Sequence, residues 1–201
     1  MKRILFLFAV LSLIASCKKD DSEHKAKLYA LDDIEGNYRI ESIIWEGGTE
    51  IDQDNDGHCS RDLMNEFRYF SWPIGNYTQI KTQANKEKKE YGGVIYFSIP
   101  FLEIYVDGGQ PKNEFHYLDF ILPFRMQGIG NFVFDHFDHS EFRDEMDKNH
   151  YPARDSFRDG DVVSFENEKI QFRLKDYMVY DFSSSSYITG SVLMTFAMVH
   201  E

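Results

Sequence analysis

The chain has 201 residues, and its 22 Lys+Arg against 34 Asp+Glu give a formal net charge of −12. Hydrophobic residues make up 42% and aromatic residues 16%, which excludes a disordered chain because such chains bury too little apolar surface. The acidic balance excludes a protein that neutralises phosphates, so we expect no nucleic-acid partner. The length fits one main domain with a sizeable core.

The N-terminus has the pattern of an export signal. Lys2 and Arg3 precede a largely apolar stretch, residues 4–13, that is too short to span a bilayer, which needs about 20 residues. The sequence Ile-Ala-Ser-Cys that ends at Cys17 resembles a bacterial lipobox, in which the cysteine is lipidated and becomes the mature N-terminus. We therefore expect a signal peptide over residues 1–16 and attachment to a membrane through lipid on Cys17.

The residues after this cysteine indicate a destination. Residues 18–23, Lys-Lys-Asp-Asp-Ser-Glu, resemble the signal that sends lipoproteins of the Bacteroidetes to the outer cell surface. Because the stretch is polar, we expect residues 17–32 to form the lipidated Cys and a flexible tether. The predicted location is the outer membrane, lipid-anchored and exposed at the cell surface. The folded domain would then occupy residues 33–201.

The first half of this domain favours strands. Residues 37–46 form the first, with Tyr38, Ile40 and Ile44 on one face. Pro100 is expected to break a later strand or to lie at a bulge, because proline cannot donate to a strand ladder. The further strands predicted in this half run over residues 67–72, 77–81, 94–106 and 115–124.

The second half has a clearer pattern. Polar and apolar residues alternate over residues 168–175, and the side chains that should point inward are Ile170, Phe172 and Leu174. Asn167 and Glu168 favour a tight turn back to residues 162–165. Two more strands follow, over residues 177–182 and near the C-terminus, where one face carries Val192, Met194, Phe196 and Met198.

One short helix is predicted over residues 140–149, with Ser140 as its N-cap. Together these elements predict an all-β fold, an antiparallel barrel or sandwich of about eight to ten strands with one short helix. With Cys17 lipidated, Cys59 has no partner for a disulfide, and we expect it to be buried, as free cysteines usually are.

One segment carries a more specific resemblance. Residues 34–43 are followed by residues 51–57, by Ser60, and by an Asp-Leu-Met turn with Glu66 close behind. This resembles the lipocalin-like lipoprotein domains of the Bacteroidetes, whose first strand follows the pattern G-x-W-x-L-x-S; here Tyr38 stands in place of the tryptophan. The resemblance implies a calycin-type barrel of about eight strands. It implies no ligand, because most members have no known activity.

The acidic part of this segment is a candidate calcium site. Asp52, Asp54 and Asp56, with the glycine that follows, match positions 1, 3, 5 and 6 of a calcium loop. Position twelve is leucine instead of glutamate, so the loop is not an EF-hand, and Asp62 or Glu66 would have to complete it. The alternative is an ordinary turn in which Asp and Asn bond to their own backbone. A bound ion would stiffen the loop.

A weaker candidate metal site lies at His136 and His139, whose imidazoles would suit zinc or another transition metal. On a helix this spacing brings the two rings together, but on a strand it places them on opposite faces. The alternative is an acidic surface loop that happens to contain histidines. The chain has no H-E-x-x-H, G-x-S-x-G or P-loop motif, so we predict no catalytic residues and no enzyme activity.

The aromatic residues leave the function open. Dense aromatic stretches at residues 67–72 and 96–101 can stack on sugars, line an apolar cavity or fill a core. Our first hypothesis is a non-catalytic binding or accessory module for a hydrophobic or glycan ligand, which predicts a hollow barrel. The alternative is a structural or assembly lipoprotein with a packed barrel and no ligand. A carboxylate- or metal-dependent hydrolase is a third, less favoured hypothesis, and the sequence identifies no protein partner.

Overall fold

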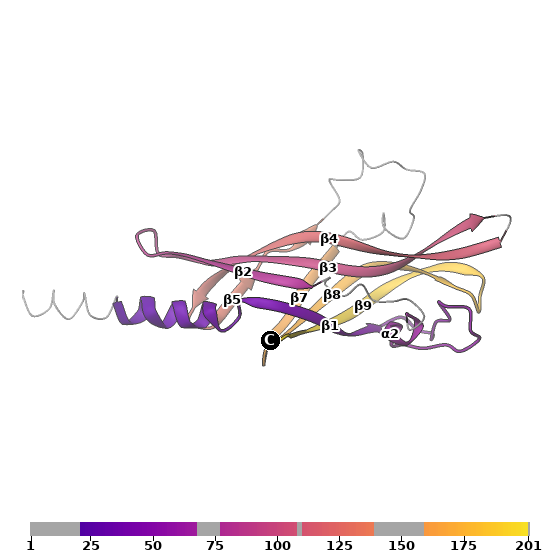
Figure 1. Ribbon diagram of the computed structural model, residues 1–201, viewed down its shortest axis with the longest axis horizontal. Coiled ribbons are helices and arrows are strands. Elements are labelled where there is room, and N and C mark those ends of the chain that lie inside the picture. The colour runs from indigo at the N-terminus through magenta and orange to yellow at the C-terminus, as the bar shows by residue number, and fades with distance from the viewer. Residues whose placement is uncertain (1–20, 68–76, 108–109, 139–158, 201) are drawn as a thin grey trace, which may run out of the picture.

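The computed structural model describes residues 21–67, 77–107, 110–138 and 159–200 (Figure 1). Residues 21–32 are helical, and a short helix, α2, spans Leu63–Glu66. The strands are β1 (Gly36–Trp45), β2 (Thr78–Asn85), β3 (Glu90–Asp107), β4 (Gln110–Gly128), β5 (Asn131–Phe134), β6 (Phe137–Asp138), β7 (Asp159–Glu166), β8 (Lys169–Asp181) and β9 (Ser186–Met198).

All nine strands belong to one antiparallel sheet in the order β5-β4-β3-β2-β1-β9-β8-β7-β6. The sheet curls into a nearly closed barrel of eight strands, to which the two-residue β6 adds a short edge. The first and last strands pair with each other, so the gap in the barrel lies between β5 and β6 and not between the chain ends. The predicted all-β antiparallel barrel is confirmed, and it is compatible with a lipocalin-like fold.

Aromatic rings fill the interior. The ring of Phe97 on β3 lies 5.0 Å from that of Phe120, 4.7 Å from that of Phe172 and 5.4 Å from that of Phe196. Phe137 adds a fifth ring, 4.0 Å from Phe120. Each such pair is worth ~0.5–1.5 kcal/mol beyond the burial of its area. The part of the barrel that the structure describes is therefore packed around these rings, where our first hypothesis predicted a hollow interior.

A bulge in β1 changes which side chains point inward. The register between β1 and β9 shifts between Ile40 and Ser42, so the alternation of faces is reset. Before the bulge Tyr38 is fully buried, as predicted, but beyond it Ile43 points inward. Ile44 is 37% exposed, and its predicted place beside Tyr38 is wrong.

The hairpin of β7 and β8 forms as the pattern predicts. The three residues predicted to point inward on β8, Ile170, Phe172 and Leu174, are fully buried. Asn167 and Glu168 make the turn to β7 with φ angles of 52° and 61°. A left-handed pair of residues of this kind matches the twist of the two strands, which makes two-residue hairpin turns favourable.

Two predicted strand breaks are absent. Pro100 lies within β3, which pairs with β2 only as far as Tyr96 and continues with β4 alone among the described strands. Proline is tolerated there because that side of β3 is an edge. The strands predicted over residues 168–175 and 177–182 are one strand, β8, in which a register shift between Leu174 and Tyr177 takes up the irregularity.

The predicted tether contains regular structure. Residues 21–32 are helical, and Leu31, only 1% exposed, packs into the barrel core together with Ile34. Lys27 Nζ lies 4.8 Å from the centroid of the Tyr91 ring, which attaches the helix to β3. The prediction of a flexible tether is therefore wrong for this segment, in which the less exposed residues His24, Lys27, Leu28 and Leu31 follow the spacing of one helical face. No helix among the described residues has the length and apolar character needed to cross a bilayer.

Some predictions fall outside the described residues. They are the helix at residues 140–149, His139 beside it, and most of the strand at residues 67–72. Cys59 is described and is exposed, so its predicted burial is wrong. It follows a sharp turn at Gly57, where the chain lies at the surface and has no core to enter.

The packed interior yields a prediction about stability. Replacing Phe97 with Ala should lower the free energy of unfolding by ~3–5 kcal/mol, because it leaves a cavity among the surrounding rings. Tyr96→Ala, one residue away on the outer face, removes a side chain that is 38% exposed and should cost much less. Urea unfolding followed by far-UV circular dichroism measures both. Equal losses in the two variants would contradict the packed interior.

Candidate functional site

The acidic segment forms a closed loop between β1 and α2. The backbones of Ile51 and Ser60 bond to each other in both directions, at 3.0 and 2.8 Å, and this closes the base of the loop. Within it, the Asp52 carboxylate accepts from the backbone N–H of Asp56 at 3.3 Å and of Gly57 at 3.1 Å. Gly57 has φ of 80°, a conformation that glycine adopts without strain. The loop is therefore built partly by its own carboxylates, as an Asx turn would be.

Three of the predicted calcium ligands come together at this loop. Asp52, Asp54 and Glu66 each place a carboxylate oxygen within 4.8 Å of the others. Asp52 is 3% exposed and Glu66, supplied by α2, is 4% exposed. Burial, with the nearby charges of Asp54 and Asp52, raises the pKa of Glu66 to about 6. Bringing these carboxylates together out of water is costly, and a hard cation among them would offset that cost.

The other two predicted ligands have different partners. The Asp56 carboxylate accepts from the His58 N–H at 2.8 Å. The Asp62 carboxylate caps α2 through the N–H of Met64, at 3.1 Å. Neither belongs to the group of three among the described residues. Calcium takes 6–8 oxygen ligands, so a calcium ion here would need backbone carbonyls or water besides the three side chains.

Asp181, which no sequence motif singles out, holds this loop against the barrel. The buried carboxylate of Asp181, at the end of β8, accepts from the Asp52 N–H at 3.1 Å, and the Phe182 N–H donates to the Asp52 carbonyl at 2.7 Å. The same carboxylate accepts from the Ser183 hydroxyl at 2.8 Å. No local pattern could reveal this contact, because Asp52 and Asp181 are 129 residues apart.

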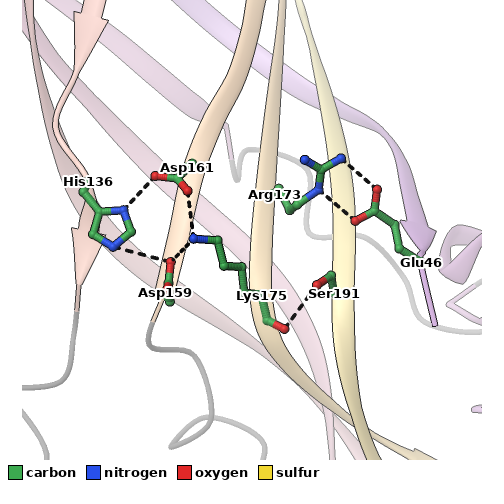
Figure 2. A network of polar contacts seen from close by, with 7 residues as sticks. All are labelled: Glu46, His136, Asp159, Asp161, Arg173, Lys175 and Ser191. Atoms are coloured by element: carbon green, nitrogen blue, oxygen red, sulfur yellow. Dashed lines mark hydrogen bonds and ion pairs between the residues drawn. The ribbon is translucent and has the colours of Figure 1, made fainter.

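His136 lies between two carboxylates of β7 (Figure 2). Its Nδ1 lies 2.7 Å from Asp161 Oδ1 and its Nε2 lies 3.4 Å from Asp159 Oδ1. Lys175 Nζ reaches the same two side chains at 2.9 and 3.0 Å. These three potential metal ligands do lie close together, but the two aspartates already share an ion pair with the Lys175 ammonium, which offsets one of their two negative charges. The pairing of His136 with His139 stays a prediction.

This polar network stands at the gap in the barrel. His136 lies in the link between the edge strands β5 and β6, while the two aspartates belong to β7 and the lysine to β8 (Figure 2). Farther along the gap, the Phe165 ring of β7 lies 5.7 Å from Phe132 and 6.4 Å from Phe134 of β5. In the described sheet β5 and β7 make no backbone pairs with each other. Contacts between their side chains therefore hold the two sides of the gap together.

A second salt bridge joins β8 to the end of β1 on the same outer face (Figure 2). The Arg173 guanidinium makes two hydrogen bonds to the Glu46 carboxylate, at 2.8 and 2.9 Å. This bidentate pair spans the intervening strand β9 and raises the pKa of Arg173. Its two donors and two acceptors are matched to each other, so the pair is structural and presents no reactive group.

A cavity of about 450 Å³ lies on the outside of the barrel over β3 and β4. Two pairs of directly opposed residues line it, Tyr96 with Ile121 and Ser98 with Asp119. Tyr77, which immediately precedes β2, completes the lining. We call this the outer groove. Phe97 and Phe120 form its base, and their rings belong to the packed interior.

The two tyrosines of the outer groove lie beside cationic side chains. The Arg39 guanidinium is 5.7 Å from the centroid of the Tyr77 ring and donates to its hydroxyl at 3.3 Å. Lys81 Nζ is 5.4 Å from the centroid of the Tyr96 ring. Cation–π contacts of this kind hold aromatic rings in place at a surface. The aromatic stretch at residues 96–101 can be read from the sequence, but the groove cannot, because its lining combines β3, β4 and Tyr77.

No protein-family model matches the chain, and no curated protein or solved structure is significantly similar to it. The resemblance to lipocalin-like proteins is therefore supported by the barrel alone. A barrel of this kind can serve many functions. The function has to be inferred from the side chains of the acidic loop, the network at the gap and the outer groove.

The network at the gap yields a prediction about acid titration. The pKa of Asp161 is lowered, first by its hydrogen bond with His136 and then by that with Lys175. The ionised Asp161 carboxylate therefore stabilises the fold at pH values above the ordinary carboxyl pKa, and this stabilisation is lost as the pH falls through the lowered pKa. His136→Ala should raise the pKa of Asp161, which ¹³C NMR of the side-chain carboxyl measures. His58→Ala is the control, and an unchanged Asp161 titration in His136→Ala would refute the contact.

Proposed function

We propose that the protein is a surface-anchored outer-membrane lipoprotein that acts as a non-catalytic binding or accessory module, held by lipid on Cys17. We further propose that it belongs with the lipocalin-like lipoproteins of the Bacteroidetes and binds its ligand on the outside of the barrel. The observation that carries this proposal is the outer groove, which lies directly over an interior filled with aromatic rings.

The contrast between inside and outside supports this choice. A ligand inside the barrel would have to displace Phe97 or Phe172, which are 1% and 0% exposed. Opening that core would forfeit the contacts of several rings at once. The outer groove is already formed, and its volume of about 450 Å³ lies within the ~300–1,000 Å³ typical of small-molecule sites.

The N-terminal helix supports a role at a membrane surface. Only residues 18–20 separate Cys17 from the helical residues 21–32. The helix lies along the long axis of the molecule at one end of the barrel (Figure 1) and packs into the core through Leu31. A lipid at Cys17 would therefore hold the barrel through a structured connection that limits how far it can turn.

The alternative function, a structural or assembly lipoprotein without a ligand, is favoured by the same packed interior. It differs in that the outer groove would then bind nothing. A hydrolase is less favoured, because the two aspartates nearest His136 are already paired with Lys175 and the buried carboxylates of the loop support its backbone. We propose no catalytic role for either group.

The anchoring part of the proposal predicts how the protein behaves in cells. Wild-type protein should fractionate with the outer membrane and be degraded by proteinase K added to intact cells. Cys17→Ala should leave the membrane fraction, because the anchor needs the lipidated thiol. Cys59→Ala, which removes the other cysteine, is the matched control and should behave as wild type. Wild-type protein that is protected from the protease, or Cys17→Ala protein that stays membrane-bound, would contradict the proposal.

Calcium enters the proposal as a structural ion. The residues that would hold it are Asp52, Asp54 and Glu66, whose oxygens already converge and whose loop is fixed to β8. Hard oxygen donors of this kind suit Ca²⁺. The ion would neutralise the carboxylates and stiffen the loop.

The calcium proposal predicts a stability change. After treatment with a chelator, adding Ca²⁺ to the purified full chain should raise its melting temperature. The gain is worth about 2.7 kcal/mol at a concentration 100 times the dissociation constant. Glu66→Gln should reduce the gain, whereas Asp161→Asn, a carboxylate outside the loop, should not. Differential scanning calorimetry measures it, and an undiminished gain in Glu66→Gln would exclude the site.

A further inference from the structure

We propose that the outer groove is a binding site for neutral saccharides. A sugar ring would stack on Tyr96, and its hydroxyls would donate to the carboxylate of Asp119 and bond to the hydroxyl of Ser98. This inference rests on the proposed function, because it assigns a ligand class and a site to the binding module. The outer groove combines an open volume with exposed aromatic and polar side chains.

The sheet places these groups on one surface. Side chains alternate across a strand, so on β3 Tyr96 and Ser98 point outward while Phe97 points inward. Asp119 and Ile121 stand opposite them on β4 and are both exposed. Ser98 and Asp119 are directly paired, a position in which Cβ atoms lie ~4.5–5.5 Å apart, whereas Tyr96 is diagonal to Asp119, at ~7–8 Å, which is still within reach of an aromatic side chain.

The chemistry of the lining favours a saccharide over other ligands. A sugar ring has an apolar face of C–H groups, which packs on an aromatic ring, and an edge of hydroxyls, which need acceptors and donors. Tyr96 and Ile121 supply apolar surface at 38% and 56% exposure, while Asp119 and Ser98 supply polar atoms. A purely apolar ligand would leave the Asp119 carboxylate without a partner in the contact. An anionic ligand would be repelled by Asp119, the one charged residue in the described lining, because Arg39 and Lys81 contact the tyrosine rings and do not line the groove.

The groove is also rigid, which reduces the entropy lost on binding. Its base is the stacked pair Phe97 and Phe120, with ring planes only 23° apart. The Ser98 N–H donates to the Thr78 hydroxyl at 3.3 Å, and Arg39 holds the Tyr77 hydroxyl at the same distance. The aromatic surface is therefore in place before a ligand arrives.

Affinity electrophoresis tests the site. The full chain, expressed with its own leader and purified in detergent, is run in native gels that contain soluble starch, xylan, mannan, laminarin or polygalacturonate. We expect at least one of the four neutral polymers to retard the wild-type protein and the anionic polygalacturonate not to. Tyr96→Ala and Asp119→Asn should each weaken that retardation about tenfold or more, as the loss of a central contact residue does.

Tyr187→Ala is the matched control. Tyr187 is 39% exposed, almost the same fraction as Tyr96, but it lies on β9 outside the groove. This variant should bind as wild type does. Asp119→Asn keeps the shape of an exposed side chain and is expected to fold even if Tyr96→Ala does not, and near-UV circular dichroism checks both.

Three results would overturn the inference. In the first, none of the neutral polymers retards the wild-type protein. In the second, polygalacturonate alone retards it. In the third, Tyr96→Ala and Asp119→Asn are both retarded as strongly as wild type. The third result would leave the proposed function standing with its site elsewhere on the protein. Failure of the proposed function is a separate outcome, seen as wild-type protein that intact cells protect from proteinase K.

Discussion

The packing of phenyl rings inside the barrel is the constraint on which the rest of the structure depends. Phe97 contacts rings from β4, β8 and β9, so one side chain joins opposite walls of the sheet. A barrel closed around such a cluster has its interior occupied by its own residues. A ligand is then left with the outer surface, where the residue neighbouring Phe97 on each side points outward. The strand that forms the core thus also forms the outer groove.

The same packing explains how the barrel tolerates a gap. β5 and β7 approach each other without pairing in the described sheet, yet Phe165 reaches Phe132 and Phe134 across the space between them. At one end of this gap His136 and Lys175 hold the two aspartates of β7. Unpaired strand edges are hazardous because they invite other strands to add to them. Here aromatic rings cover the edge, and charged groups lie at its end.

The sequence predicted what local alternation determines. The inward positions of β8 and the turn at Asn167 follow from neighbours in the chain, and both are confirmed. The bulge at Ile40, the unbroken strand through Pro100 and the helix that replaces the flexible tether depend on which surfaces meet in the fold. Of the candidate calcium ligands, only Asp52, Asp54 and Glu66 converge, because Asp62 is used to cap α2. The outer groove was not predictable, since its lining combines Tyr77 with two strands whose register no local pattern gives.

The acidic loop and the outer groove differ in what their polar groups do for the fold. At the loop, the carboxylates of Asp52 and Glu66 accept from backbone N–H groups, and the Asp181 carboxylate at the end of β8 accepts from the Asp52 N–H, so these side chains are needed to hold the chain in place. In the groove, Asp119 and Tyr96 are exposed, and the core beneath them is held by apolar rings. Side chains that the fold does not require remain available to a ligand. This difference is the physical reason for assigning a structural ion to the loop and recognition to the groove.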